Sequence, residues 1–139
     1  MDFFAQFEKD VYAKRMGIEL VEIGEGRAVA RMKLRPHHLN SVGVAHGGAI
    51  FTLADFVFAA VADSHATVTL GVESSISFLR AISNPGETLT ATGEEVSLKD
   101  RFSCCRVQVT DSQGEVIAIF QGLAYRKKDK LEGFVFPGK

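Results

Sequence analysis

The sequence predicts an α+β fold in which an antiparallel sheet wraps around one central helix. Residues 46–62 are apolar on nearly every side at helical spacing, so a helix formed by them must be covered by other elements. Most of the remaining chain alternates in period two between short polar connections, which is typical of antiparallel strands. One helix and one large sheet are both satisfied when the sheet curls around the helix.

The 139 residues have the size and composition of one globular domain. Hydrophobic residues make up 46% and charged residues 24%, which excludes a disordered chain or a coiled coil as the main architecture. The formal net charge of −1 provides no overall attraction to nucleic acid or to anionic membranes. We expect a single domain over residues 1–139, with its core over about 15–126, a short N-terminal helix and a charged C-terminal tail.

The N-terminus and the longest apolar stretch indicate the compartment in which the protein is expected. Residues 1–15 lack the basic start, apolar run and cleavage site of a signal peptide. The stretch 49–62 contains Thr52 and Asp55 and is too short to cross a hydrocarbon layer of about 30 Å. We therefore expect a cytoplasmic protein without a membrane span.

The first elements precede the central helix. Residues 3–15 carry phenylalanines at helical spacing and predict one short amphipathic helix. Residues 18–23 and 27–34 alternate around Gly24-Glu25-Gly26, which predicts a hairpin. The core-facing side chains expected on its second strand are Ala28, Ala30, Met32 and Leu34.

Four strands are expected after the central helix, arranged as a meander. Their ranges are 67–82, 88–98, 102–110 and 115–125. The turn Asn84-Pro85-Gly86-Glu87 has proline and glycine where a type II turn requires them. One sheet cannot cover every side of the helix, so each protomer is expected to leave an edge or face that pairs with a second copy.

The two cysteines are adjacent within an expected strand. Cys104 and Cys105 then point to opposite faces of the sheet, which excludes a disulfide framework. A nucleophilic cysteine assisted by a histidine stays open as an alternative.

Asp55 is the only formally charged side chain, histidines aside, between Arg35 and Asp63. It lies in the middle of the apolar helix, where an unpaired buried carboxylate costs several kcal/mol. Either it pairs with an arginine or with backbone N–H groups, or it stands at an apolar cleft. In the cleft, desolvation raises its pKa and makes it a base or a nucleophile.

The helix begins at His46-Gly47-Gly48. The first N–H groups of a helix have no internal acceptor, and glycines leave room for a carbonyl oxygen to approach them. Gly48 and Asp55 are seven residues apart, about 10.5 Å along the axis, whereas an attacking group must lie within about 3.5 Å of its carbonyl. One chain cannot supply both groups, so the pair predicts an active site shared between two protomers.

Residues 39–55, LNSVGVAHGGAIFTLAD, resemble the signature of the hotdog-fold acyl-CoA thioesterases of the phenylacetate-pathway, or PaaI-like, family. Segments 77–80 and 88–91 match as well, and the similarity covers roughly residues 15–126. The resemblance implies a hotdog fold, assembly as a homodimer and commonly as a homotetramer built from two dimers, and hydrolysis of a coenzyme A thioester. It implies no metal and no organic cofactor, with coenzyme A as part of the substrate.

The resemblance also implies roles for individual residues. Asp55 would be the nucleophile or the general base, and the Gly48 N–H would polarise the thioester carbonyl. Asn40 and His46 match positions that orient the substrate, the water or the leaving sulfur. The substrate-binding candidates are Gly47, Phe51, Thr69, Arg80 and Arg101.

Coenzyme A carries phosphates, for which basic side chains are suitable partners. The candidates, each of which is otherwise a solvated surface charge, are Arg80, Lys99, Arg101, Arg126 and Lys128. Ala81 replaces the proline that often follows the Phe-Leu-Arg element, which affects the turn near the nucleotide. Phe51, Phe56 and Phe58 belong to an acyl pocket or to the core.

The sequence was also compared with three other functions. His37 and His38 together with His46 lack the carboxylates or thiols that would complete a metal site. A hotdog hydratase or dehydratase requires a histidine base with an acid partner, whereas the helix carries Asp55 alone. A non-catalytic acyl-CoA-binding module is the remaining alternative. No motif predicts the acyl group or the arrangement of a tetramer.

Overall fold

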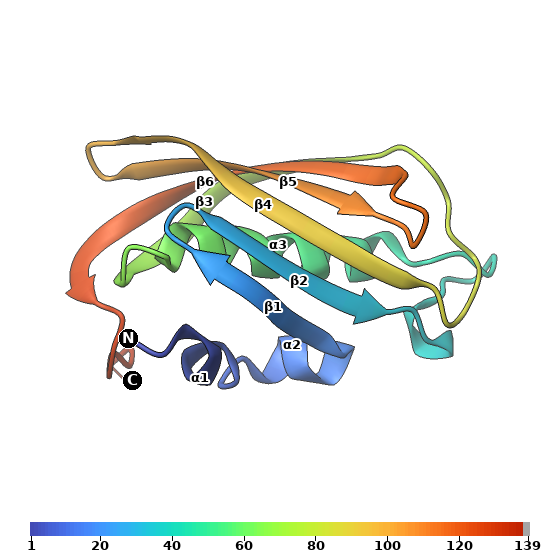
Figure 1. Cartoon of the computed structure of the whole chain (residues 1–139), viewed down its shortest axis with the longest axis horizontal. Coiled ribbons are helices and arrows are strands. Elements are labelled where there is room, and N and C mark those ends of the chain that lie inside the picture. The colour runs from blue at the N-terminus through green and yellow to red at the C-terminus, as the bar shows by residue number, and fades with distance from the viewer. Residues whose placement is uncertain (138–139) are drawn as a thin grey trace.

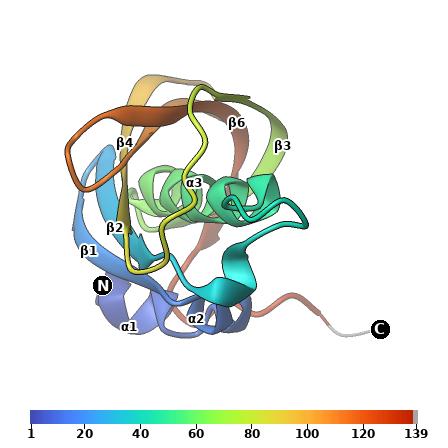
Figure 2. The same cartoon turned by 90° about the vertical axis from the view of Figure 1, so that its right-hand side faces the viewer.

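The computed structural model describes residues 1–137 as a six-stranded antiparallel sheet around one long helix, α3 (Gly47–Asp63) (Figure 1). The sheet order is β1-β2-β4-β5-β6-β3. Viewed nearly along α3, the sheet curves around the helix from β1 to β3, with the N-terminal helices below (Figure 2). The predicted fold class is confirmed.

The N-terminal segment differs from the single helix expected over residues 3–15. It forms two helices, α1 (Phe3–Phe7) and α2 (Val11–Met16). The Asp2 carboxylate accepts from the Ala5 N–H at 3.1 Å, and the Asp10 carboxylate accepts from the Ala13 N–H at 2.9 Å. A second N-cap therefore starts a new helix where the spacing of the phenylalanines alone suggested continuity.

The first hairpin follows the prediction. It consists of β1 (Ile18–Gly24) and β2 (Arg27–Lys33). Gly26 turns the chain with a φ of +75°, a conformation that favours glycine. The four expected core residues of the second strand are fully buried: Ala28, Ala30, Met32 and Leu34.

The later strands are β3 (Thr67–Phe78), β4 (Thr88–Lys99), β5 (Phe102–Thr110) and β6 (Val116–Lys130). Two predicted bounds are wrong. β3 ends at Phe78 because the next two N–H groups both donate to the Ile117 carbonyl and turn the chain away. β6 continues to Lys130, where it still pairs with Thr67, so the first part of the expected charged tail is strand.

The expected four-strand meander holds only for β4, β5 and β6. β3 pairs with β6 at the far edge, and β4 pairs with β2. The loop 79–87 makes this return and contains the predicted turn, in which the Glu87 N–H donates to the Asn84 carbonyl at 3.1 Å and Gly86 has a φ of +97°.

The helix packs closely on the sheet at two glycines. A Cβ at Gly122 would lie 2.8 Å from the ring of Phe58, and one at Gly93 would lie 2.6 Å from a methyl of Val57. Phe58 and Val57 are buried between helix and sheet, each worth about 1.5–3 kcal/mol of hydrophobic stabilisation. The absence of side chains on these two glycines lets the sheet come this near to α3.

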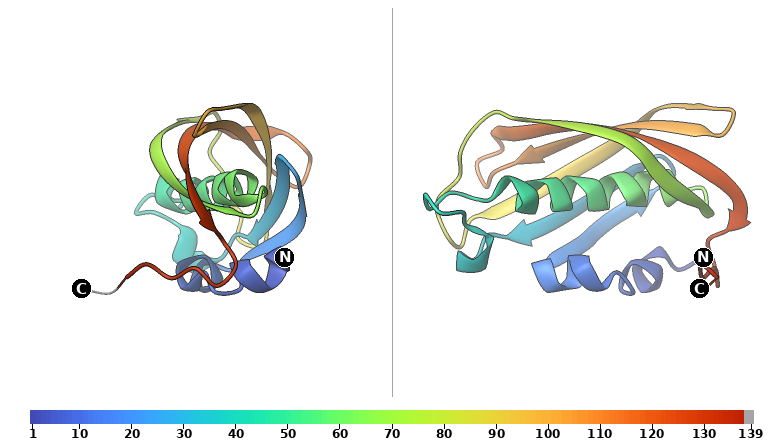
Figure 3. Two further views of the ribbon diagram at one scale, coloured as in Figure 1. Left: turned by 90° about the vertical axis from the view of Figure 1, so that its left-hand side faces the viewer. Right: turned by 180° about the vertical axis from the view of Figure 1, so that it is seen from behind.

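One side of α3 faces no strand. Seen from behind, β3 crosses the C-terminal end of the helix, and the rest of the helix lies between β3 and the N-terminal helices with no strand in front of it (Figure 3). The residues along this side are exposed or half-buried: Gly48, Phe51, Thr52, Asp55 and Ala59. β3 is also an edge strand, and most of its residues are exposed. Over residues 1–137 no helix is both long and apolar enough to span a membrane.

Candidate active site

The start of α3 has one backbone N–H group without an acceptor. His46 is the N-cap, and its Nδ1 accepts from the Gly48 N–H at 2.8 Å. The N–H groups of Ala49 and Ile50 donate to the His46 carbonyl at 2.9 and 3.2 Å. Within residues 1–137, the Gly47 N–H has no acceptor. It is therefore the donor that a ligand at the helix start would meet, whereas the expected donor, Gly48, is occupied.

The capping hydrogen bond also fixes the tautomer of the neutral His46 ring. Because Nδ1 accepts, the neutral ring carries its hydrogen on Nε2. Nε2 has no partner in the described part of the chain, and His46 is exposed. The ring thus offers a second donor at the helix start.

Both positions require small residues. A Cβ at Gly48 would lie 3.0 Å from His46 Nδ1 and would press on the capping ring. A Cβ at Gly47 would lie 3.2 Å from the Phe78 ring, at the end of β3. The two glycines keep the cap and the approach to the free N–H open.

Asn40 shapes the loop that leads to His46. Its Oδ1 accepts from the N–H groups of Val42 at 3.0 Å and Val44 at 3.2 Å. The Asn40 Nδ2 has no partner among the described residues, so this amide still has two N–H donors for a ligand.

Asp55 lies on the open side of α3 and is exposed in the protomer, not buried as expected. No hydrogen bond or ion pair to its carboxyl occurs within residues 1–137, so the arginine or backbone partner considered above is not found in one protomer. Although the residue is exposed, neighbouring atoms partly shield its carboxyl from water, and this desolvation raises its pKa. The negative charge of Asp10 raises the pKa further. Asp55 is an unpaired carboxyl with strengthened basicity.

An apolar cavity of about 380 Å³ opens beside the free N–H. Gly47 and Ile50 form one wall, and Phe78 forms another. The remaining lining residues are Val44, Ala45, Leu79, Arg80 and Ala81. Asp55 lies eight residues along the helix from Gly47, about 12 Å, so a carbonyl bound at Gly47 is beyond the reach of Asp55 of the same chain.

The three phenylalanines of α3 separate into two groups. Phe56 and Phe58 are buried, with ring centroids 5.5 Å from those of Phe7 and Phe120, and both belong to the core. Phe51 is half-buried next to the open side of the helix, with its ring 5.4 Å from Phe120. Of the three, Phe51 alone remains placed to meet a ligand.

Thr69 lies at the opposite end of α3 from Gly47. Its hydroxyl donates to the Asp63 carboxylate at 2.6 Å. Burial raises the pKa of Asp63 to about 6, against the opposing effect of this hydrogen bond. Within one protomer, the Thr69 hydroxyl is committed to Asp63.

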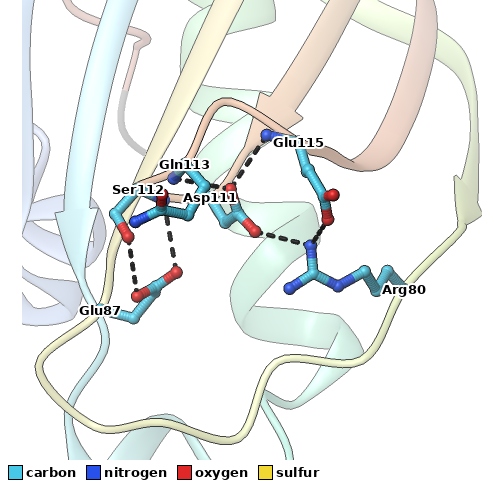
Figure 4. A network of polar contacts seen from close by, with 6 residues as sticks. All are labelled: Arg80, Glu87, Asp111, Ser112, Gln113 and Glu115. Carbon is cyan, nitrogen blue, oxygen red and sulfur yellow. Dashed lines mark hydrogen bonds and ion pairs between the residues drawn. The ribbon is translucent and has the colours of Figure 1, made fainter.

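Arg80 is also committed, although it borders the cavity. Its guanidinium bonds the carboxylates of Asp111, at 2.7 Å, and Glu115 (Figure 4). The same Asp111 carboxylate accepts from the N–H groups of Gln113 and Glu115, both at 2.9 Å. Arg80 therefore fastens the 79–87 loop to the β5–β6 turn. Its positive charge, which was expected to meet a phosphate of coenzyme A, is paired with these two carboxylates.

Arg101 holds the β4–β5 turn against β6. Its Nε donates to the Arg126 carbonyl at 2.8 Å, and the Arg126 N–H donates to the Arg101 carbonyl at 2.6 Å. One guanidinium N–H of Arg101 is used in this way. No carboxylate within residues 1–137 pairs with it.

Two side chains considered for alternative chemistries, His38 and Cys105, are buried. No group of three potential metal ligands occurs in the described chain. His38 is buried, accepts from the Arg35 N–H at 2.9 Å and donates to the Met16 carbonyl at 2.9 Å, so it is a neutral structural residue. Burial raises the pKa of the Cys105 thiol to about 11, which disfavours a thiolate nucleophile.

Two residues that shape the site were not predicted from the sequence. Phe78 reaches Gly47 because β3 ends beside the helix start, and no local pattern encodes that proximity. Asp10 influences Asp55 across the packing of α2 on α3. The only available signal was an N-cap residue in front of a short helical run.

Comparisons with known proteins identify the family of this chain. The family model of the thioesterase superfamily matches residues 42–118. The acyl-coenzyme A thioesterase PaaI of Escherichia coli K12 is 32% identical over 93% of this chain and 91% of its own. The solved structure of E. coli PaaI, from the phenylacetic acid degradation operon, superposes with a TM-score of 0.87 at 31% identity over 91% of both chains.

A hypothetical thioesterase protein of Streptococcus pneumoniae TIGR4, solved with coenzyme A, superposes with a TM-score of 0.84 at 25% identity over 91% of this chain and 98% of that one. The matched residues include the helix start and Asp55, and the shared architecture is the sheet wrapped around α3. The chain therefore belongs to the thioesterase superfamily, in its hotdog-fold, PaaI-like branch, and is a thioester hydrolase.

Proposed function

We propose that this protein hydrolyses acyl-CoA thioesters to the free acid and coenzyme A, at sites built between the two protomers of a homodimer. One observation carries the proposal. The Gly47 N–H and the Asp55 carboxyl, the two groups that thioester hydrolysis requires, are both unpaired and lie on the accessible part of one helix. The streptococcal relative solved with coenzyme A supports the substrate class.

The free edge of β3 supports the assembly. A twofold axis perpendicular to this strand pairs it antiparallel with its copy and continues the sheet across the interface. The same axis lays the two α3 helices side by side in opposite directions along their open sides. Gly47 of one protomer then approaches Asp55 of the other, which removes the separation of about 12 Å within one chain.

The proposed chemistry follows from the donors at the helix start. The Gly47 N–H donates to the thioester carbonyl oxygen, where negative charge develops as the carbonyl carbon is attacked. Asp55 of the second protomer either takes a proton from the attacking water or attacks to form an anhydride that water then opens. In both routes the C–S bond breaks, the acid gains the oxygen of water, and the thiolate is protonated. Asn40 Nδ2 and His46 Nε2 supply donors that orient the water or the leaving sulfur.

An apolar patch on the outer face of the sheet supports a further level of assembly. Phe102 and Tyr125 are exposed neighbours, with ring centroids 5.7 Å apart. Leu70 pairs with Tyr125 in the sheet register and is also exposed. Two dimers that pack through these faces would bury the patch and form a dimer of dimers.

The proposal is tested by following free thiol release from a panel of acyl-CoA esters, with Asp55→Asn beside the wild type. Asp55 is exposed, so the variant is expected to fold and to assemble normally while losing hydrolysis. A correctly assembled Asp55→Asn protein that hydrolyses as fast as wild type overturns the mechanism.

Mixed dimers test the shared site. Gly47 is the first helical residue, and His46 before it has φ −60° and ψ 134°, so the backbone accepts proline there and Gly47→Pro removes the N–H. The added ring crowds Phe78, so folding and assembly of this variant are checked first. In a mixed dimer of Asp55→Asn with Gly47→Pro, one site keeps both groups, and about half of the wild-type activity should return. A mixture as inactive as its parents argues against sharing.

A further inference from the structure

The C-terminal segment, residues 131–137, continues beyond β6 from a fixed starting point. The Leu131 side chain is buried, and its N–H donates to the carbonyl of Ala66 at 2.9 Å, just after the end of α3. Gly133 has a φ of +76°, and the Phe134 N–H donates to the Leu131 carbonyl at 3.1 Å. The segment therefore leaves the fold in a defined direction from the C-terminal end of α3.

Beyond Gly133 the segment presents apolar side chains to the solvent. Phe134 and Phe136 contact each other edge to face, with ring centroids 5.0 Å apart. Val135 between them is 82% exposed, and Phe136 is exposed as well. The next most exposed large apolar side chain in residues 1–137 is Val42, at 78%. A run of exposed apolar residues is typical of a segment that contacts a partner.

The segment extends on the side where α3 is open. In Figure 2 it emerges beside α2 and runs out beyond β3. The left panel of Figure 3, seen from the opposite end of the molecule, shows it on the same side. β3 is the free edge of the sheet there. The second protomer of the proposed dimer lies on this side, so the segment extends toward it.

The sheet register shows which part of the partner the segment reaches. Lys130 pairs with Thr67 at the start of β3, whereas Phe78 at the end of β3 borders Gly47. Antiparallel pairing of β3 with its copy sets the start of one strand beside the end of the other. Lys130 then lies about two strand spacings, or about 10 Å, from the Gly47 end of the other protomer. Residues 131–136 span up to about 17 Å when extended, which is enough to reach that end.

The loop before α3, residues 36–46, offers a complementary surface at that end of the partner. His37 and Val42 are both exposed on it. The His37 ring lies against the buried His38 ring, with centroids 4.3 Å apart, which holds it as an aromatic surface. The Asn40 side chain accepts from the Val42 N–H at 3.0 Å and fixes the backbone of that residue. Groups that are already held in place bind phenylalanine rings at a low cost in entropy.

We propose that residues 134–136 cross the dimer interface and pack on the 36–46 loop of the other protomer, where they close the site that contains its Gly47. The inference rests on the proposed function and its shared sites. Each site then takes Gly47, His46 and Asn40 from one protomer, and Asp55 and the C-terminal segment from the other. Closure excludes bulk water from the donors at the helix start, which strengthens their hydrogen bonds to a bound carbonyl.

Cross-linking tests the contact without turnover. Chains with Val42→Cys and chains with Val135→Cys are co-expressed and treated with a short bismaleimide, all in a Cys104→Ser background because Cys104 is partly exposed. Each chain carries one added cysteine, so a covalent dimer formed mainly in the mixture joins the segment of one protomer to the loop of the other. The matched control replaces Val42→Cys by Val96→Cys, on the exposed part of β4. No covalent dimer, or an equal yield in the control, overturns the proposal.

Turnover tests what the contact does. The variant Phe134→Ser/Val135→Ser/Phe136→Ser should lower kcat/KM for acyl-CoA esters about tenfold, because the apolar contacts that close the site are lost. The control Val96→Ser/Leu98→Ser removes exposed apolar side chains from β4 and should keep the wild-type value. An unchanged kcat/KM in the first variant, or an equal fall in the control, overturns the role in closure. Failure of the proposed function looks different, because the wild type would then hydrolyse no acyl-CoA ester while the cross-link still formed.

Mixed dimers, purified through two different tags, show which protomer supplies the segment to a site. When the triple serine variant is paired with Gly47→Pro, the one functional site takes Asp55 and an intact segment from the Gly47→Pro chain. We expect wild-type kcat/KM for that site. When the variant is paired with Asp55→Asn, the one functional site takes Asp55 and the altered segment from the same chain, and kcat/KM should be about tenfold lower. Equal values in the two dimers, or the reverse order, would overturn the assignment.

Discussion

The two ends of α3 carry similar residues in opposite states. At the C-terminal end, the Ser64 hydroxyl donates to the Val61 carbonyl at 2.7 Å and accepts from the Gly26 N–H at 2.8 Å. His65 uses both ring nitrogens, with Nε2 3.0 Å from Glu95 and Nδ1 3.4 Å from Glu25. The Ser103 hydroxyl donates to the second Glu95 oxygen at 2.5 Å.

At the N-terminal end, His46 uses one ring nitrogen for the cap, and the Gly47 N–H has no partner within residues 1–137. Both ends combine a histidine, a helix terminus and a nearby glycine, so residue types alone do not separate them. What separates them is whether the histidine and the groups of the helix terminus are satisfied internally, since satisfied groups stabilise the fold and accessible unsatisfied ones are available to a ligand.

The largest expected effect compares two aspartates of the same helix. Asp55→Asn should lower kcat by about 10²–10⁴-fold, because the base or nucleophile is lost. Asp63→Asn, at the satisfied end, should keep kcat near the wild-type value. Thiol-release kinetics on both proteins provide the measurement, and a comparable loss in both would show that the distinction between the ends is wrong.

The neighbouring glycines divide function from stability at the N-terminal end. Gly47→Pro should lower kcat by about 10²–10³-fold through loss of the carbonyl donor, a larger loss than in Gly47→Ala, which adds a Cβ next to Phe78 but keeps the N–H. Gly48→Ala should instead cost about 1 kcal/mol of unfolding free energy, because its Cβ presses on the capping His46 ring. Kinetics and chemical denaturation on both variants check the assignment, which a reversed pattern would contradict.

Asp63 is expected to reduce stability at neutral and alkaline pH. Its folded pKa of about 6 lies above the ordinary 3.8, so the folded state binds the proton more tightly and stability falls as pH rises between these values. Asp63→Asn should therefore raise the unfolding free energy at pH 8 by about 1–3 kcal/mol and by much less at pH 4. Denaturation at both pH values tests this, and an Asn variant that is less stable at pH 8 would refute it.

The smallest effect concerns the pH dependence of turnover. Activity requires the ionised Asp55, so kcat/KM should fall as pH drops through its raised pKa. Asp10→Asn removes a neighbouring negative charge but keeps an oxygen to cap α2, and it should move this acid limb to lower pH. A pH–rate profile that stays in place, or that moves upward, would contradict the influence of Asp10.

Much of the fold could be read from local patterns. The hairpin around Gly26, the turn at Asn84–Glu87 and the apolar helix each depend on residues close in sequence. The position of β3 in the sheet could not be predicted in this way, because its pairing with β6 rather than β4 depends on contacts between distant segments. For the same reason the expected end of the last strand was five residues short, since β6 continues only where β3 supports it.

The candidate site shows the same division. The sequence alone singled out Asp55, His46 and the two glycines, because a lone carboxylate and a Gly-Gly helix start are local and chemically distinctive. The tertiary structure decided which donors and cations are available. It occupied the Gly48 N–H, Thr69 and Arg80 with internal partners and left the Gly47 N–H and the Asp55 carboxyl without any. Availability is set by the neighbours that folding brings together, and a linear pattern does not contain them.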